Sequence, residues 1–127
     1  MRLLLDTHAL IWALGDSASL SHRARAAISA ADVKLVSAVS AYEICLKHRL
    51  GKLRDAAALA ANFEEEIAAC DALPLPISIA HAVEAGKLDR SHKDPFDRLL
   101  IAQSRIEGVP IVSSDTLFDA FGVERVW

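Results

Sequence analysis

The segment Arg2-Leu-Leu-Leu-Asp6-Thr-His8-Ala-Leu-Ile-Trp12 sets the pattern for the rest of the chain. Its three leucines, Leu3 to Leu5, form a short apolar run that is typical of a buried strand. The residues from Thr7 to Leu14 then have helical character until Gly15-Asp16-Ser17 interrupts them. The chain therefore begins with a strand, an acid and a helix.

The same alternation of apolar runs and helical segments continues to the end of the chain. Helices are expected over 21–31, 40–51, 55–70, a segment ending near 88, and 94–107; strands are expected over 33–36, 73–77, 109–112 and 123–127. Pro74 and Pro76 favour an edge position for 73–77, and 123–127 is expected as a terminal edge strand. Strands joined by helices are usually parallel, so the sequence predicts an α/β fold, a three-layer α/β/α sandwich with a mostly parallel central sheet.

Length and composition fit one globular domain over residues 1–127. The chain has 127 residues, 53% of them hydrophobic, which suffices for a core without disulfides. The spacing of Cys45 and Cys70 predicts free thiols in a reducing cytoplasm rather than a metal knuckle. No apolar stretch is long enough to predict a membrane span. The net charge of −3 argues against a general polyanion binder, because such proteins usually carry a basic excess.

Acidic residues follow the predicted strands where each strand ends. Asp6 follows the first strand, Glu43 comes soon after the second, and Asp115 follows the strand 109–112. Asp94 and Asp97 lie in the first turn of a predicted helix. Because the carboxyl ends of parallel strands share one edge of a sheet, these acids are expected to converge on one crevice.

Clustered carboxylates repel one another unless a cation neutralises them. Oxygen ligands without His or Cys favour Mg²⁺ or Mn²⁺, ions that activate water and stabilise the charge of a reacting phosphodiester. Structural alternatives remain for several of the acids. Glu43 fits a capping box with Ser40, Asp94 before Pro95 fits an N-cap, and Asp115 fits a cap or turn, whereas Asp6 has no obvious structural role.

Four blocks of sequence in this order resemble PIN-domain proteins, and most closely the VapC-type toxins of type II toxin–antitoxin systems. The blocks are 1–12, Val36-Ser-Ala-Val-Ser-Ala-Tyr-Glu43 with its continuation to Leu53, Asp94-Pro-Phe-Asp97-Arg-Leu-Leu-Ile-Ala-Gln103, and Val112-Ser-Ser-Asp115. Tyr42 stands where close relatives often have Trp. The resemblance covers essentially the whole chain and implies a PIN-like fold.

The resemblance also implies an Mg²⁺- or Mn²⁺-dependent ribonuclease with an acidic quartet of Asp6, Glu43, Asp97 and Asp115. Asp94 would be an additional acid at the rim, and Ser113 and Thr7 would be secondary site residues. We choose Asp97 over Asp94 as the third acid because the apolar helix Leu99-Leu-Ile-Ala follows it directly. The resemblance further implies a cytoplasmic toxin, an RNA substrate, a homodimer, and a cognate antitoxin whose tail carries a basic residue.

Two groups of basic residues flank the predicted ligands. The first includes Lys47 and Arg49, with His48, Lys52 and Arg54; the second includes Lys93 and Arg98, with Lys87, Arg90 and His92. We expect Lys93 and Arg98 to contact RNA phosphates and consider Lys47 and Arg49 as further candidates, the alternative being ordinary solvated helix faces.

Two other functions remain compatible with the acids. An aspartyl-nucleophile phosphatase also has an Asp after its N-terminal strand, but it needs a second Asp two residues on, where this chain has His8. A non-catalytic module could use an acidic groove to bind a basic peptide without turnover.

Overall fold

The computed structural model describes residues 1–89 and 92–127 and contains a five-stranded parallel sheet. The strands are β1 (Arg2–Leu5), β2 (Val33–Ser37), β3 (Ala72–Leu75), β4 (Ile111–Val112) and β5 (Arg125–Val126), in the order β3-β2-β1-β4-β5. The predicted parallel α/β fold is confirmed. The two edges are β3, which contains Pro74, and the last strand, β5, as expected.

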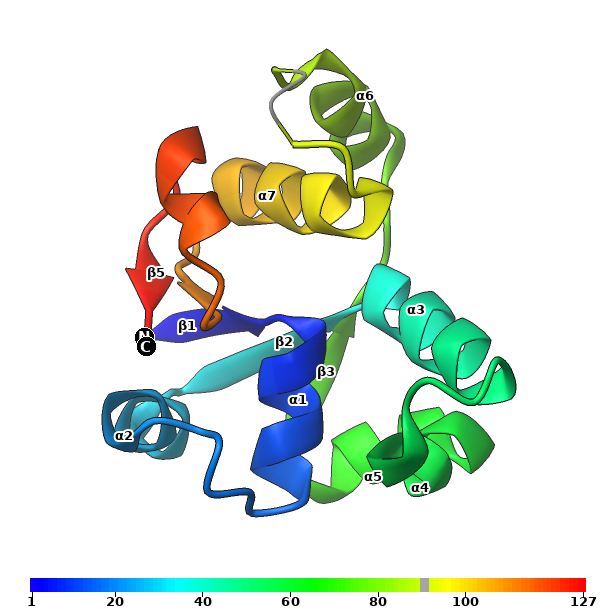
Figure 1. Ribbon diagram of the computed structural model, residues 1–127. Coiled ribbons are helices and arrows are strands. Elements are labelled where there is room, and N and C mark those ends of the chain that lie inside the picture. The colour runs from blue at the N-terminus through cyan, green and yellow to red at the C-terminus, as the bar shows by residue number, and fades with distance from the viewer. Residues whose placement is uncertain (90–91) are drawn as a thin grey trace.

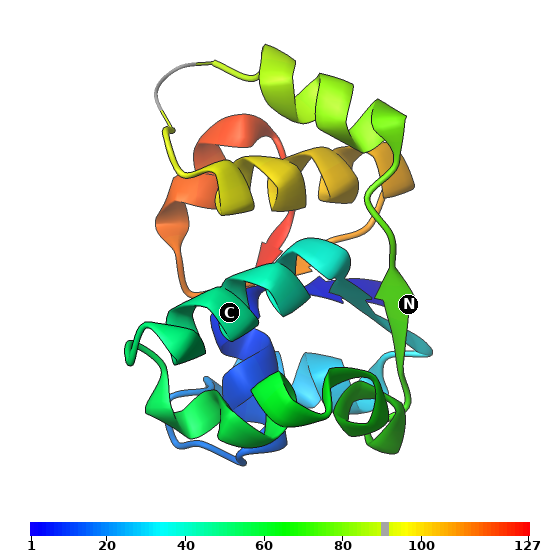
Figure 2. The ribbon, with the colours of Figure 1, turned by 90° about the vertical axis from the view of Figure 1, so that its right-hand side faces the viewer.

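Helices cover both faces of the sheet (Figure 1). The helices are α1 (Thr7–Leu14), α2 (His22–Ala30), α3 (Ala38–Arg49), α4 (Ala57–Ala61), α5 (Phe63–Ala69), α6 (Ile79–Lys87) and α7 (Pro95–Glu107), with 3-10 turns η1 (Arg54–Ala56) and η2 (Thr116–Phe121). One face carries α1, α2, α4 and α5, and the other carries α7 with α6 packed outside it (Figure 2). No helix of the described residues is long and apolar enough to cross a membrane.

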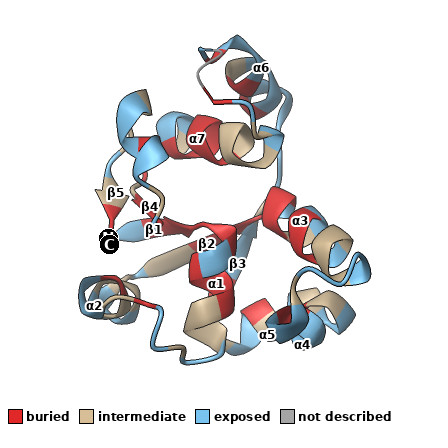
Figure 3. Ribbon diagram, in the orientation of Figure 1, coloured by how far each residue is buried: buried red, intermediate tan, exposed pale blue. Residues whose placement is uncertain are grey.

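The leucines of β1 point alternately into the two layers, as the period of a strand requires. Leu3 and Leu5 pack with α1, α2, α4 and α5, whereas Leu4 packs with Leu100 and Ile101 of α7. All three leucines are almost fully buried, and Figure 3 shows buried residues along β1 and in α1, α3 and α7. The run that predicts the first strand therefore belongs to both halves of the core.

Several predicted element boundaries are wrong, including those of the edge strands, which are expected over 73–77 and 123–127 and found at Ala72–Leu75 and Arg125–Val126. The helix expected over 55–70 is broken at Asn62, whose φ of −141° and ψ of 59° are not helical, into α4 and α5. The strand expected over 109–112 is limited to Ile111 and Val112. Helix α3 begins at Ala38 rather than Ser40, because Ser37 is its N-cap and accepts a hydrogen bond from the amide of Val39.

Candidate active site

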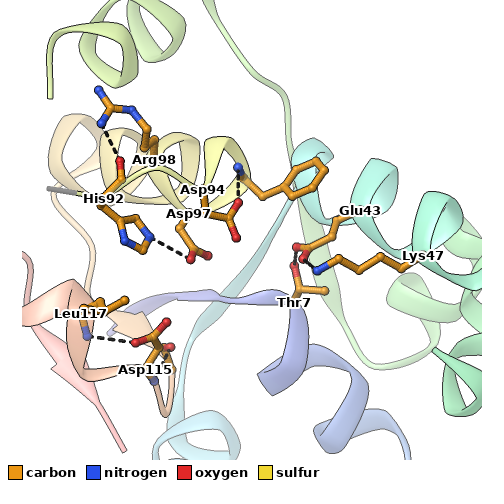
Figure 4. A network of polar contacts seen from close by, with 11 residues as sticks. Thr7, Glu43, Lys47, His92, Asp94, Asp97, Arg98, Asp115 and Leu117 are labelled. Carbon is orange, nitrogen blue, oxygen red and sulfur yellow. Dashed lines mark hydrogen bonds and ion pairs between the residues drawn. The ribbon is translucent and has the colours of Figure 1, made fainter. Parts of the chain in front are cut away.

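A pocket of about 440 Å³ lies at the carboxyl edge of the sheet, among the ends of four separate chain segments. All five predicted acids line it. The full lining is Asp6, Thr7, His8, Trp12, Glu43, Lys47, Asp94, Asp97, Ser114 and Asp115. The expectation that acids distant in sequence converge on one crevice therefore agrees with the geometry, and Figure 4 shows several of them around it.

Asp6 is the N-cap of α1 as well as a pocket residue. Its Oδ1 accepts a hydrogen bond of 2.7 Å from the amide of Ala9, so the expectation that Asp6 lacks a structural role is wrong. Burial raises the pKa of Asp6 from 3.8 to about 6. Hydrogen bonds from Ser113 and Ala9 lower this pKa, and the charge of Asp97 raises it. A nearby cation would favour the ionised form of this buried carboxylate.

Glu43 is buried on α3, where Thr7 and Lys47 contact it from two sides (Figure 4). The Thr7 hydroxyl donates to Glu43 Oε1 at 2.6 Å, and the Lys47 ammonium forms an ion pair with Oε2. Ser40 lies beside Thr7, with the two hydroxyl oxygens 3.1 Å apart, and does not cap the helix. The capping-box interpretation of Ser40 and Glu43 is therefore wrong, and Glu43 points to the pocket.

The two acids at the start of α7 have different partners. Asp94 is the N-cap and accepts a hydrogen bond of 2.9 Å from the amide of Phe96, as its place before Pro95 predicts. Asp97 Oδ2 lies 2.9 Å from His92 Nε2. Desolvation raises the pKa of Asp97, the hydrogen bond to His92 lowers it, and the charges of Asp94 and Asp115 raise it.

Asp115 and Ser113 follow β4 and complete the pocket edge. The side chain of Asp115 accepts a hydrogen bond of 3.0 Å from the amide of Leu117 and caps the 3-10 turn η2. Ser113 is fully buried, and its Oγ accepts a hydrogen bond of 3.0 Å from the amide of Asp115. Ser113 thus fixes the backbone that carries the last acid.

The donor set suits a hard divalent cation by its chemistry, since it consists of carboxylates and hydroxyls. As the side chains stand, however, no three His, Cys, Asp or Glu residues of the described chain are grouped so that they could hold a metal ion. Each of the five carboxylates instead has a partner within the protein. Binding a metal therefore requires some of these side chains to turn toward a common centre.

The predicted RNA-contact residues have different surroundings. Lys47 lines the pocket, and its Nζ lies 5.8 Å from the centroid of the Phe96 ring. Arg49 and Lys93 are exposed outside the pocket lining, and Arg90 lies outside the described residues. The guanidinium of Arg98 donates four hydrogen bonds to backbone carbonyls, so its observed role is to hold the chain rather than to face a ligand.

Sequence reasoning missed the pairing of His92 with Asp97 and the ion pair of Lys47 with Glu43. A signal for Lys47 existed, because a Lys four residues after a Glu on a helix favours an ion pair. For His92 the only signal was its position five residues before Asp97.

Aromatic residues flank the pocket. Trp12 lines it and contacts the rings of His8 and Trp127, with centroid distances of 5.4 and 5.6 Å. Tyr42, which is 62% exposed, contacts Phe96 at 5.7 Å. Trp12 therefore gives the acidic pocket an aromatic wall, whereas Tyr42, Phe96 and Trp127 lie outside its lining.

With the parallel sheet and the acidic pocket at its carboxyl edge defined, comparison with protein families gives a clear result. A family model described as the PIN domain matches residues 3–124. The chain belongs to the PIN-domain family. No curated protein matches the sequence.

Solved structures with the same fold include VapBC and FitAB proteins and a toxin–antitoxin complex from Klebsiella pneumoniae. VapBC2 from Rickettsia felis, bound to a DNA fragment from its promoter, is 11% identical with a TM-score of 0.71 over 98% of this chain and 97% of the other. VapC20 from Mycobacterium tuberculosis, a Sarcin-Ricin loop cleaving toxin, is 20% identical with a TM-score of 0.66 over 95% of each chain. FitAcB from Neisseria gonorrhoeae is 19% identical with a TM-score of 0.68 over 97% and 95%. The recognition of a PIN domain similar to VapC-type toxins is thus confirmed.

Proposed function

We propose that this chain is a Mg²⁺- or Mn²⁺-dependent endoribonuclease and the toxin of a toxin–antitoxin pair. The observation that carries the proposal is the convergence of five carboxylates from four chain segments on one pocket of a PIN domain. The raised pKa values of Asp6 and Asp97 support it, because desolvation, with a smaller contribution from neighbouring carboxylate charges, disfavours the ionised forms, and a divalent cation would offset that cost. The similarity to a toxin that cleaves the Sarcin-Ricin loop supports RNA as the substrate.

Asp6 and Asp97 would be the principal metal ligands, with Glu43 and Asp115 completing the site and orienting water. Bound there, Mg²⁺ or Mn²⁺ supplies a nucleophile from water and stabilises the charge on the phosphodiester. Thr7 holds Glu43 in place through its hydroxyl, and Ser113 holds the backbone amide of Asp115. Asp94 remains at the rim as a helix cap.

Lys47 would contact the RNA backbone once Glu43 turns to the metal. Its ammonium already lies at the pocket, and ion pairing to Glu43 occupies it while no other cation is bound. The aromatic rings of Trp12 and Tyr42 suit unpaired bases, which stack on such side chains. The substrate would therefore be a single-stranded or looped RNA.

The partner would be an antitoxin that presents a basic residue to the acidic pocket, since a guanidinium pairs well with carboxylates. The similarity to VapBC and FitAB complexes supports this assignment. A homodimer and a cytoplasmic location complete the proposal.

The test is RNA cleavage by the purified chain with Mg²⁺ or Mn²⁺, with EDTA, and with Asp6→Asn. Asparagine caps a helix about as well as aspartate, so this variant removes the charge and keeps the cap. Loss of a residue that merely supports a metal ligand commonly lowers metal affinity or activity by about 10- to 100-fold. Asp6→Asn changes a ligand itself, so we expect this variant to lose more than about 100-fold in activity. Asp55→Asn, on an exposed turn outside the pocket, is the matched control.

Cleavage that survives EDTA, or that is undiminished in Asp6→Asn, contradicts the proposal. A phospho-aspartate trapped at Asp6 would instead indicate the aspartyl-nucleophile phosphatase. Binding of a basic peptide with neither turnover nor Mn²⁺ binding would indicate the acidic-groove module.

A further inference from the structure

His92 lies immediately before α7, buried between that helix and Phe121. Its exposed fraction is 8%, and its ring contacts the Phe121 ring at a centroid distance of 5.9 Å. The Nε2 atom lies 2.9 Å from Asp97 Oδ2 (Figure 4). An ionised carboxylate only accepts hydrogen bonds, so His92 is the donor. His92 therefore fixes one carboxylate oxygen of Asp97, Oδ2, and the other oxygen, Oδ1, remains available to the pocket that Asp97 lines.

The backbone of His92 is itself held by α7. Arg98, the residue after Asp97, donates 2.8 Å to the carbonyl oxygen of His92 (Figure 4). It also donates to three other carbonyl oxygens of the preceding segment, those of Leu88, Asp89 and Ala85, at 2.6, 2.7 and 3.1 Å. The first turn of α7 thus carries both Asp97 and the arginine that fixes the donor of Asp97.

A second buried histidine offers an internal comparison. His81 Nε2 lies 3.0 Å from Glu107 Oε2, at the opposite end of α7 from Asp97. The two pairs share the same chemistry and similar burial of the imidazole, but neither His81 nor Glu107 lines the acidic pocket. The His81 pair therefore serves the packing of α6 on α7, whereas the His92 pair ends in a carboxylate that faces the pocket.

We propose that His92 is a positioning residue that orients the Asp97 carboxylate for metal binding, an inference that rests on the proposed function. A free aspartate rotates about two bonds, and fixing Oδ2 restricts Oδ1 to one direction. Carboxylates that bind metals commonly need such an outer partner, and its loss typically weakens metal affinity by about 10- to 100-fold. Arg98 supports the same arrangement by fixing the backbone of His92.

The experiment is calorimetric titration of the full chain with Mn²⁺, without RNA. His92→Leu removes the donor, and His92→Gln places an amide N–H near the position of Nε2. We expect His92→Leu to weaken Mn²⁺ binding by about 10-fold or more and His92→Gln to restore most of it. His81→Leu is the control, expected to lower the free energy of unfolding in urea without weakening Mn²⁺ binding.

A double-variant cycle tests whether His92 acts through Asp97. In an Asp97→Asn background, His92→Leu should weaken Mn²⁺ binding no further. Equal Mn²⁺ affinity in wild type and His92→Leu, or a His92→Gln variant as weak as His92→Leu in a folded protein, overturns the inference and leaves the proposed function intact. A wild-type chain that binds no Mn²⁺ overturns both.

Discussion

Among single residues, Lys47 is notable because its side chain lines the acidic pocket. Its ammonium pairs with Glu43 and lies near the face of Phe96, so it partly neutralises a buried carboxylate. A metal bound by Glu43 would release this ammonium for a phosphate. Under the proposed function, Lys47 would pair with Glu43 in the metal-free pocket and with a phosphate in the metal-bound pocket.

We expect Lys47→Met to weaken RNA binding and to reduce the slope of log affinity against log salt by about one, because one phosphate contact is lost. The measurement is fluorescence anisotropy with a short single-stranded RNA and the Asp6→Asn chain, which binds without cutting, at several salt concentrations. Lys34→Met, near the amino end of β2 and away from the pocket, should leave the slope unchanged. An unchanged slope in Lys47→Met would assign this lysine to Glu43 alone.

Among the elements, the start of α7 carries two acids with different roles. Asp94 caps the helix through the amide of Phe96, whereas Asp97 faces the pocket with His92 behind it. Asp94→Ala should therefore lower the free energy of unfolding by about 1 kcal/mol, and Asp94→Asn should restore it, since asparagine also caps.

The same variants distinguish the two acids in catalysis. Asp94→Asn should keep most of the RNA cleavage activity, and Asp97→Asn should lose more than about 100-fold with little loss of stability. Urea unfolding and cleavage of the same RNA measure the two effects. Comparable activity losses in Asp94→Asn and Asp97→Asn would show that both acids bind the metal.

The parallel sheet and its acidic edge could be predicted from sequence because both follow from local patterns. Apolar runs such as Leu3 to Leu5 mark the strands, and the acids that follow β1, β2 and β4 must reach the shared carboxyl edge. The break at Asn62 could not, because Ala-rich and Glu-rich stretches of high helix propensity lie on both sides of it and one residue of lower propensity does not by itself end a helix. Leu59 of α4 and Ile67 of α5 are both buried in one core, although the chain between them is not helical at Asn62.

The hydrogen-bond partners of the site side chains could not be predicted from the sequence either. The sequence Ser40 to Glu43 matches the capping-box pattern, but α3 begins earlier, at Ala38, and Ser37 is its N-cap. The contact of His92 with Asp97 depends on how the chain before α7 folds back, which Arg98 fixes through carbonyl oxygens. Backbone carbonyls have no sequence signature, so Arg98 was expected to face RNA instead.

At the scale of the whole molecule, the buried acids make stability depend on pH. The pKa of Asp6 is raised to about 6, so between about pH 4 and 6 the folded state holds a proton that the unfolded state releases. The contribution is favourable at low pH and is lost as the pH rises through 6, for a total of about 3 kcal/mol. The raised pKa of Asp97 acts in the same direction.

We therefore expect the free energy of unfolding of the metal-free chain, measured in EDTA, to fall between pH 4 and 7. In Asp6→Asn the free energy of unfolding should fall less over the same range. Urea unfolding at intervals of pH measures the effect, and Asp55→Asn should follow the wild type. Parallel pH profiles of wild type and Asp6→Asn would show that Asp6 ionises normally.

Divalent metal should reverse this loss. Because binding displaces protons from carboxylates, Mn²⁺ should raise the midpoint of thermal unfolding more at pH 7.5 than at pH 5. At 100 times its dissociation constant the ion would stabilise the fold by about 2.7 kcal/mol. Scanning calorimetry in buffer with Mn²⁺ and in buffer with EDTA measures the shift of the thermal midpoint at each pH. Asp97→Asn should show a much smaller shift than the wild type. An equal shift at both pH values would argue against carboxylates as the ligands.

Three of the pocket acids each hold a backbone amide: Asp6 holds Ala9, Asp94 holds Phe96, and Asp115 holds Leu117. The resonance frequency of an amide proton depends on the charge and direction of its acceptor. In a ¹⁵N-labelled sample these three amides are therefore spectroscopic probes for three of the four segments that meet at the pocket, all except the α3 segment that carries Glu43. A Mg²⁺ titration followed by nuclear magnetic resonance would record, amide by amide, which carboxylates leave their caps and in what order.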